Sequence, residues 1–128
     1  KPDIEIEGLK LFWNQTDKDW INSKDSELEV GSIHTIQGYD LNYAGVVIGK
    51  DIGIDPVSKR IVFRRDNYFD SKGTLNNIVQ GIVYTDEDIL QYIVNIYRVL
   101  LTRGIKGTFI YVCDSELRSL VKSRIAQE

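Results

Sequence analysis

The 128 residues carry 16 Lys and Arg against 19 Asp and Glu, a formal net charge of −3, and 42% of them are hydrophobic. That length and composition are those of one globular domain, whereas a stand-alone nucleic-acid binder usually has a basic footprint. One cysteine and one histidine exclude an internal disulfide and a Cys/His zinc cluster. No long apolar run or signal peptide is present, so we expect a cytoplasmic chain that does not enter a membrane. We expect no metal site. The chain lacks methionine, which indicates a piece cut from a longer protein.

The first forty residues predict short strands and polar loops. Residues 14–24 are mostly polar and are interpreted as a loop, and residues 30–35 as a short strand. We expect Trp13 and Trp20 in the core, because tryptophan is usually largely buried; stacking on bases is the alternative. Half-buried strands are indicated by alternating apolar positions at Ile4, Ile6, Leu9, Leu11 and Trp13.

The middle of the chain predicts one buried strand and a hairpin. Residues 43–48 (YAGVVI) form a continuous apolar run, which is typical of a strand covered on both faces of a parallel sheet. The Asp55-Pro56 turn and the apolar residues 61–63 predict a hairpin over 50–63. Residues 64–84 are predicted to be a loop or insertion.

The C-terminal part predicts a helix, a strand and a second helix. Thr85 caps the first helix, and Gly104 is its predicted stop. Residues 108–113 form a second buried strand that contains Cys113 as a core thiol. Asp114 or Ser115 caps the last helix, whose apolar stripe is Leu117, Leu120, Val121 and Ile125. Two buried strands alternating with helices predict an α/β fold with a mostly parallel sheet.

One candidate site follows the predicted strand at residues 30–35. Gly38 lets a ligand approach the backbone closely, and the carboxylate of Asp40 is suited to a ribose hydroxyl. Short polar groups at Ser32, His34 and Thr35 are suited to phosphate oxygens. A plain polar connection between two strands, with Asp40 at a turn, is the alternative.

A second candidate site lies at the end of the first long helix. Arg98 and Arg103 lie on an otherwise apolar helix, and a phosphate would justify an arginine there because arginine binds phosphate oxygens with a planar fork. Alternatively, Arg103 is only a cation that stabilises a helix C-terminus.

Together the two segments resemble motifs V and VI of superfamily 1 helicases. Residues 33–40 (IHTIQGYD) are similar to motif V, with Asp40 where glutamate is usual. Residues 99–104 (VLLTRG) are similar to motif VI, and with the preceding NIYR they resemble the Schlafen group 3-like DNA/RNA helicase domain family. The resemblance covers residues 29–50 and 88–126.

The resemblance implies a RecA-like, P-loop NTPase-type three-layer fold over residues 1–128, a second motor domain without its own phosphate loop. Arg103 would be the arginine finger for ATP. Single-stranded DNA or RNA, ATP with Mg²⁺, and an N-terminal RecA-like domain of the same chain are the implied partners. Nucleotide binding is implied for Gln37, Gly38, Asp40 and Arg103, and nucleic-acid contact for Ser32, His34 and Thr35.

What the sequence lacks limits the activity of this piece. It has no G-x-x-x-x-G-K-[ST] segment, so by itself it is expected not to hydrolyse ATP. The leading interpretation is the C-terminal half of an ATP-dependent helicase or translocase. The alternatives are a non-catalytic nucleic-acid- or protein-binding module with the same fold, and, less favoured, a nuclease that uses Asp51, Asp55 and Asp66.

Overall fold

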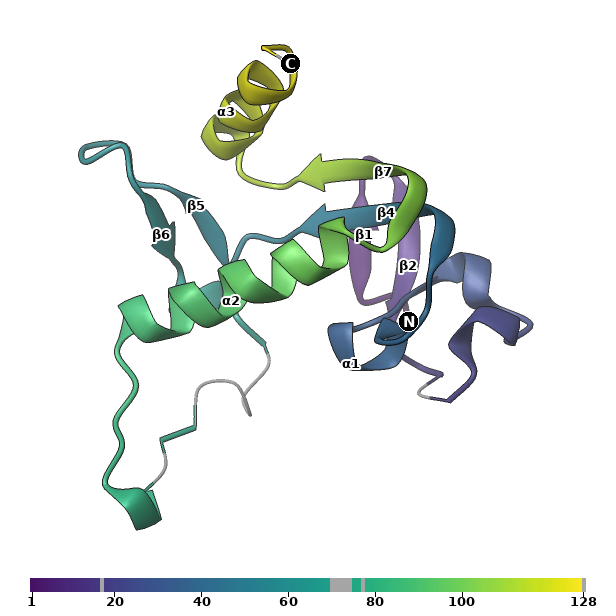
Figure 1. Ribbon diagram of the computed structural model, residues 1–128, viewed down its shortest axis with the longest axis horizontal. Coiled ribbons are helices and arrows are strands. Elements are labelled where there is room, and N and C mark those ends of the chain that lie inside the picture. The colour runs from purple at the N-terminus through teal and green to yellow at the C-terminus, as the bar shows by residue number, and fades with distance from the viewer. Residues whose placement is uncertain (17, 70–74, 77, 128) are drawn as a thin grey trace. The chain divides into compact units, whose positions relative to one another are not determined.

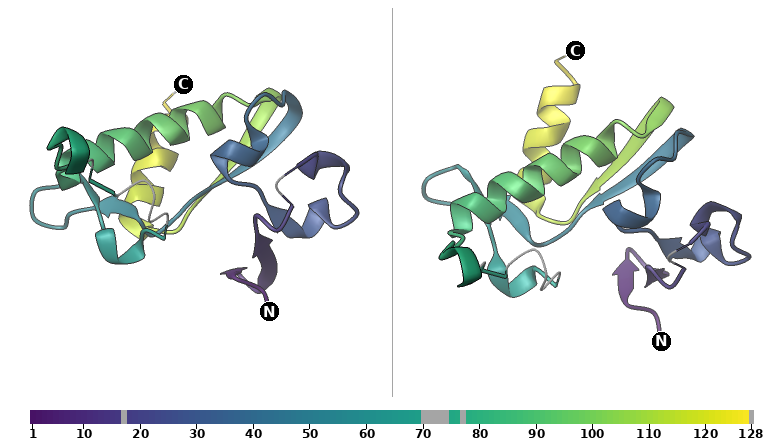
Figure 2. Two further views of the ribbon diagram at one scale, coloured as in Figure 1. Left: turned by 90° about the horizontal axis from the view of Figure 1, so that it is seen from below. Right: turned by 60° about the horizontal axis from the view of Figure 1, so that its bottom comes forward.

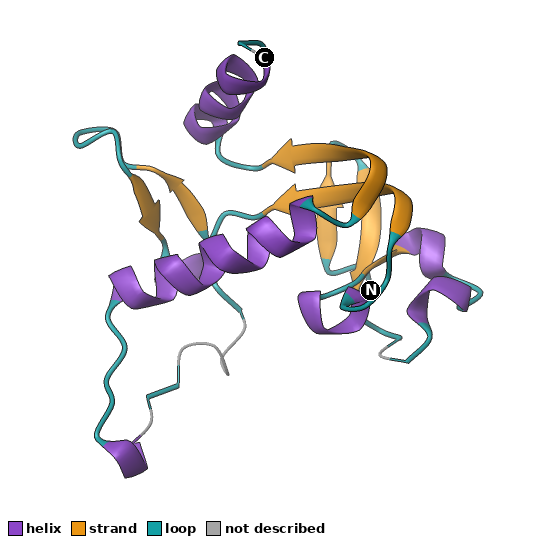
Figure 3. Ribbon diagram, viewed as in Figure 1, coloured by secondary structure: helices purple, strands orange, loops and turns teal. Residues whose placement is uncertain are grey.

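The computed structural model describes residues 1–16, 18–69, 75–76 and 78–127, which form a mixed α/β structure (Figures 1 and 3). The chain clusters into two compact units, an N-terminal unit, Lys1–Asp40, and a C-terminal unit, Leu41–Glu128. Whether they make one domain, as the sequence predicts, is not tested by this division. The three-layer RecA-like arrangement likewise stays a prediction.

The N-terminal unit is built on a small three-stranded sheet. Strand β1 (Ile4–Ile6) pairs antiparallel with β2 (Leu9–Trp13), and β2 pairs parallel with β3 (Glu29–Val30). Two 3-10 turns, η1 (Trp20–Asn22) and η2 (Ser26–Leu28), lie between β2 and β3. The alternation of apolar residues therefore predicted β1 and β2 correctly.

The predicted strand at residues 30–35 is wrong beyond its first residue. The strand ends at Val30, and residues Ile33–Ile36 form the one-turn helix α1. The reason is local: the Ser32 hydroxyl accepts a hydrogen bond from the Thr35 N–H at 3.3 Å, which starts a helical turn.

The two tryptophans of the N-terminal unit differ from expectation. Trp13, predicted in the core, is 52% exposed at the end of β2. Trp20 is half-buried, and its indole nitrogen is buried without a hydrogen-bond partner among the described residues. Periodicity indicates that a strand has two faces, but only packing decides which face is covered.

The C-terminal unit is organised by a parallel pair of strands. Strand β4 (Leu41–Ile48) pairs with β7 (Gly104–Val112), and the 16-residue helix α2 (Asp86–Leu101) connects back to β7. Helix α2 lies alongside this pair in both views of Figure 2. The hairpin of β5 (Ile52–Ile54) and β6 (Ile61–Phe63) confirms the predicted excursion.

Helix α2 begins where the sequence predicts. The Thr85 hydroxyl accepts from the Asp88 N–H at 3.2 Å, and the Asp88 carboxylate accepts from the Thr85 N–H at 2.9 Å. This reciprocal capping box satisfies two backbone donors that the first turn otherwise leaves unpaired. Ile89 and Ile93 then fall on the buried side of the helix.

The end of α2 differs from the sequence prediction. The helix ends at Leu101 with Thr102 as its C-cap, and Gly104 begins β7 instead of ending the helix. Strand β7 consequently starts four residues before the predicted 108. Cys113 follows the strand and is half-buried rather than a core thiol.

The last helix, α3 (Ser115–Ile125), is capped by Asp114, one of the two predicted cap residues, whose carboxylate accepts from the Leu117 N–H at 2.8 Å. Its predicted apolar stripe is only partly buried. Leu117 is in the core, whereas Leu120 is 38% and Ile125 57% exposed.

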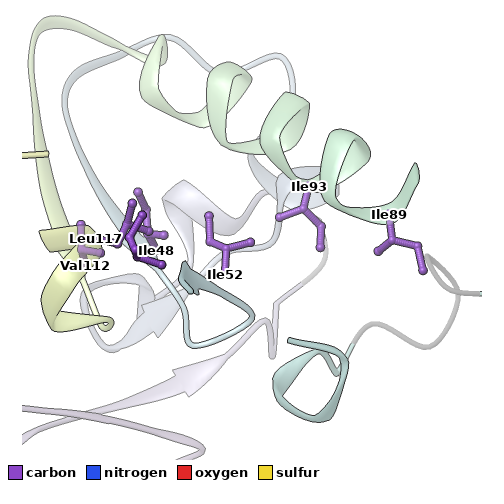
Figure 4. Packing of buried hydrophobic residues seen from close by; sticks show 7 residues of the cluster. Ile48, Ile52, Ile89, Ile93, Val112 and Leu117 are labelled. Atoms are coloured by element: carbon purple, nitrogen blue, oxygen red, sulfur yellow. The ribbon is translucent and has the colours of Figure 1, made fainter. Parts of the chain in front are cut away.

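The core of the C-terminal unit lies between β4–β7, the hairpin and the helices (Figure 4). Side chains that point to this side of the parallel strands, such as Ile48 and Val112, are buried. The prediction that the strand at residues 43–48 is covered on both faces is wrong, because Tyr43 is 60% exposed. The core cluster consists of Ile48, Ile52, Ile54, Ile89, Ile93, Val112 and Leu117.

The predicted loop at 64–84 is only partly described. Its described residues include two 3-10 turns, η3 (Arg65–Asn67) and η5 (Ile78–Gln80). Positions 70–74 and 77 lie outside the described residues.

We expect Ile93→Ala to lower the free energy of unfolding by about 2–5 kcal/mol, because it removes a side chain that is 2% exposed at the centre of the core. Urea denaturation followed by circular dichroism measures it. Ile125→Ala is the matched control, and since Ile125 is 57% exposed its cost should stay below about 1 kcal/mol. Equal costs at the two positions would contradict this description of the core.

Candidate nucleotide and nucleic-acid site

The two motif segments lead into adjacent ends of the same strand pair. The Leu41 N–H donates to the Arg103 carbonyl oxygen at 3.0 Å, and Leu41 is in register with Gly104. Asp40 directly precedes β4 and Arg103 directly precedes β7. Parallel pairing therefore places the last residues of both segments at the amino ends of the two strands.

Close backbone approach at this end depends on Gly104. A Cβ atom built on Gly104 would lie 2.1 Å from the carbonyl oxygen of Gly107 and 2.7 Å from the Thr108 hydroxyl oxygen. Those distances are far inside van der Waals contact, so a larger residue at Gly104 would force the backbone of β7 around Gly107 to shift. The Thr108 hydroxyl also donates to the Leu101 carbonyl oxygen at 3.1 Å, which ties the helix end to the strand.

Arg103 uses only part of its hydrogen-bonding capacity within the C-terminal unit. Its Nε donates to the Val99 carbonyl oxygen at 3.2 Å, so the side chain does help to satisfy the end of α2. No carboxylate in the described part of this unit lies within ion-pairing distance of it. The two terminal nitrogens of the guanidinium thus remain able to bind an anion.

The motif segment of the N-terminal unit is held together by Asn14. The side-chain oxygen of Asn14 accepts from the Ser32 N–H at 3.1 Å and from the Thr35 hydroxyl. Ser32 and Thr35 hydroxyl oxygens lie 3.1 Å apart, and Thr35 is only 8% exposed. The geometry gives Ser32 and Thr35 a structural role, whereas their contact with nucleic acid stays a prediction.

The other predicted residues of this segment lie at its surface. His34 and Gln37 are exposed, and Gln37 is the C-cap of α1. Gly38 has φ +88°, a left-handed conformation that favours glycine, so the predicted glycine turn exists. Asp40 is exposed and forms no ion pair with the described residues of its unit.

The sequence did not reveal a buried carboxylate at the opposite end of β4. Asp51 is 9% exposed and accepts a hydrogen bond from the Tyr97 hydroxyl at 3.3 Å, which itself accepts from the Gly49 N–H at 3.1 Å. Burial raises the pKa of Asp51, and burial together with the nearby Asp51 charge raises the pKa of Tyr97. Tyr97 lies on α2, 46 residues away from Asp51 in the sequence, so no local pattern indicates this contact.

A second polar contact joins the hairpin to α3. Arg64 Nη1 lies 2.8 Å from Asp114 Oδ2, and Gly53 leaves the room, because a Cβ there would be 2.5 Å from both side chains. Burial alone would raise the pKa of Asp114, but hydrogen bonds from the Leu117 N–H and from Arg64 outweigh it and lower that pKa. Asp114 is thus a helix cap and ion-pair partner.

The acids of the nuclease alternative do not gather around a common point. Asp51 binds Tyr97, and the Asp55 carboxylate accepts from the Ser58 N–H at 2.6 Å within its own turn. Within the described ranges, no three His, Cys, Asp or Glu side chains are grouped closely enough to hold a metal ion.

None of the helices in the described ranges combines the length and apolar content needed to cross a bilayer.

Comparison with known proteins gives one family and one relative of note. The family model described as "Schlafen group 3, DNA/RNA helicase domain" matches residues 1–114. The uncharacterized protein YPL245W of Saccharomyces cerevisiae is 43% identical over 117 residues, which cover 88% of this chain but 25% of that protein. No solved structure matches the chain.

We expect Asp51 to make the stability of the chain depend on pH. The pKa of Asp51 is raised in the folded state, so its contribution to the free energy of unfolding is fully present below the unfolded pKa of about 3.9. That contribution is lost as pH rises through the pKa of Asp51 in the folded protein. Asp51→Asn keeps an oxygen that accepts from Tyr97 and should remove this loss. The measurement is the free energy of unfolding of wild type and of Asp51→Asn between about pH 4 and pH 7, and the difference between the two proteins should change with pH.

Other carboxylates contribute equally to both proteins, so the difference isolates Asp51. The lowered pKa values of Asp55, Asp88 and Asp114 act in the opposite direction, with stability lost as pH falls. The same substitution at the exposed Asp66 is the control. If the free energy of unfolding changes with pH in parallel for wild type and Asp51→Asn, the buried carboxylate of Asp51 is not the source of that pH dependence.

Proposed function

Because this chain belongs to the Schlafen group 3 DNA/RNA helicase domain family, we propose that it is the C-terminal motor half of an ATP-dependent superfamily 1 DNA/RNA helicase or translocase. The family match supports a role connected with nucleic acid. The proposal goes further, to ATP hydrolysis and directed movement. The chain covers only 25% of the length of its yeast relative, so the activity concerns the whole protein that contains it.

The observation that carries the proposal is the state of Arg103. It directly precedes β7 beside the start of β4, it is held by its backbone and Nε, and its terminal nitrogens have no acidic partner in the described C-terminal unit. A preorganised guanidinium of this kind can stabilise the charge that develops on a transferring phosphoryl group. Arg103 is therefore the proposed arginine finger.

The nucleotide is proposed to bind with help from a second domain. The sequence has no phosphate-binding loop, so the phosphates and Mg²⁺ would be held mainly by another RecA-like domain of the same protein. Bound ATP supplies the phosphoryl group. In the C-terminal unit, Arg103 is proposed to act on this group. In the N-terminal unit, Gln37, Gly38 and Asp40 at the turn that precedes β4 are proposed separately as nucleotide-binding residues.

The single-stranded nucleic acid is proposed to pass over α1. Of the three predicted residues, His34 is the exposed one, and Ser32 is half-buried. Thr35, which is buried, would act by holding α1 against Asn14 and not by direct contact. With a net charge of −3, this chain would supply a modest share of the phosphate contacts.

Arg103→Ala in the complete protein should lower nucleic-acid-stimulated ATP turnover by about 10³-fold or more while ATP binding is retained, because the lost charge acts mainly in the transition state. Turnover is measured with a coupled phosphate-release assay and ATP affinity by fluorescence of a labelled nucleotide. Arg98→Ala is the matched control, since Arg98 is exposed on α2, which ends two residues before Arg103, and has no ion pair in the described residues.

The same experiment separates the motor from its alternative. Near-wild-type turnover in Arg103→Ala would remove Arg103 from the mechanism. A wild-type protein that binds nucleic acid but does not hydrolyse ATP would instead indicate a non-catalytic binding module with this fold.

A further inference from the structure

The link between α2 and β7 is short, and Arg103 is its second residue. Helix α2 ends at Leu101 and β7 begins at Gly104. The Arg103 N–H donates to the Leu100 carbonyl oxygen at 3.2 Å, and the Arg103 carbonyl oxygen accepts from the Leu41 N–H at 3.0 Å. The main chain of Arg103 is therefore tied to the helix on one side and to the strand pair on the other.

The guanidinium of Arg103 is attached to the helix. Its Nε donates to the Val99 carbonyl oxygen at 3.2 Å, and the same oxygen accepts from the N–H and the hydroxyl of Thr102 at 3.2 and 2.8 Å. Carbonyl groups of a last helical turn have no donor within the helix, so they are free to bind such groups. Because the guanidinium follows α2, a shift of the helix end against β7 would point its terminal nitrogens in another direction.

The pairing of β7 with β4 is irregular directly after Arg103. Leu41 is in register with Gly104 and Tyr43 with Gly107, so a step of three residues on β7 (107 − 104 = 3) faces a step of two on β4 (43 − 41 = 2). One extra residue in a strand is a β-bulge, which bends the strand and increases its twist. Bulges often lie beside functional sites, where they change the direction of a side chain.

The strand resumes after the bulge with Thr108, whose side chain reaches back to the helix. The Thr108 hydroxyl donates to the Leu101 carbonyl oxygen at 3.1 Å. Leu101 is the last residue of α2, so this carbonyl has no donor within the helix. The hydroxyl passes beside Gly104, where a Cβ atom would lie 2.7 Å from it. The bulge and the glycine together allow one hydroxyl to fix the end of α2 against β7.

We propose that Thr108 is a positioning residue for Arg103, because its hydrogen bond to Leu101 keeps the end of α2, and with it the guanidinium, in one place against the strands. The inference rests on the proposed function, in which Arg103 acts on the transferring phosphoryl group. Thr108 acts through Arg103 and not by contact with the nucleotide. A displacement of about 1 Å at a reacting centre can lower a rate by about 10²-fold.

Thr108→Val in the complete protein tests the positioning role, because valine removes the hydroxyl and keeps the β-branched shape that suits a strand. We expect kcat for nucleic-acid-stimulated ATP hydrolysis to fall about 10- to 100-fold while KM for ATP stays the same, since the guanidinium acts mainly in the transition state. Thr108→Ser is the matched variant, and because it keeps the hydroxyl it should recover most of the lost turnover. Equal losses in the two variants would overturn the proposal.

A second measurement separates positioning from a general loss of folded protein. The Thr108→Val change is also made in Arg103→Ala, and the residual turnover of the single and double variants is compared. If Thr108 acts through Arg103, its substitution lowers turnover no further in that background. A loss by the same factor in both backgrounds would show a merely structural role and would overturn the proposal.

The failure of this inference differs from the failure of the proposed function. Wild-type turnover in Thr108→Val, beside a strong loss in Arg103→Ala, would overturn the positioning role and leave the arginine finger in place. Wild-type turnover in Arg103→Ala, or a wild-type protein that does not hydrolyse ATP, would overturn the proposed function and the positioning role with it.

Discussion

The parallel pairing of β4 and β7 is the constraint on which the rest of the C-terminal unit depends. The two strands are joined by more than fifty residues of chain, so their pairing closes a long loop at an entropic cost that the core must offset. That core consists of β-branched and leucine side chains on one side of the strands, covered by Ile89 and Ile93 of α2. The same pairing puts the start of β4 beside the end of α2, where Arg103 is held.

The polar contacts divide between the two ends of this strand pair. At the carboxyl ends, Tyr97, Asp51 and Gly49 bind one another in a largely buried group, and Arg64 binds Asp114. Exposed ion pairs such as Lys59–Glu116 and Arg65–Asp86 contribute little, since water and salt screen them. At the amino ends, Arg103 has no acidic partner in the described unit, so the charge there is uncompensated. The carboxyl ends are thus occupied by contacts within the unit, whereas the guanidinium of Arg103 at the amino ends has no acidic partner in the described unit.

Family membership and structure support each other only at a coarse level. The match covers the chain through Asp114, which includes both motif segments, and the structure is a mixed α/β arrangement with parallel strands. The described residues of the C-terminal unit form one sheet face covered by α2 and another left largely open. The three-layer arrangement of the RecA-like fold stays a prediction.

The sequence by itself determined the elements with strong local signals. The Thr85 and Asp114 caps, the apolar run at residues 43–48 and the Asp55 turn depend on neighbouring residues, and each appears where it was predicted. Tertiary structure alone decided what depends on distant partners. Asn14 binds Ser32 and Thr35 from across the unit, Asp51 meets Tyr97 across 46 residues, and packing on one side leaves Tyr43 exposed. Local patterns encode hydrogen bonds within a turn, but burial and long-range pairing exist only once the chain has folded.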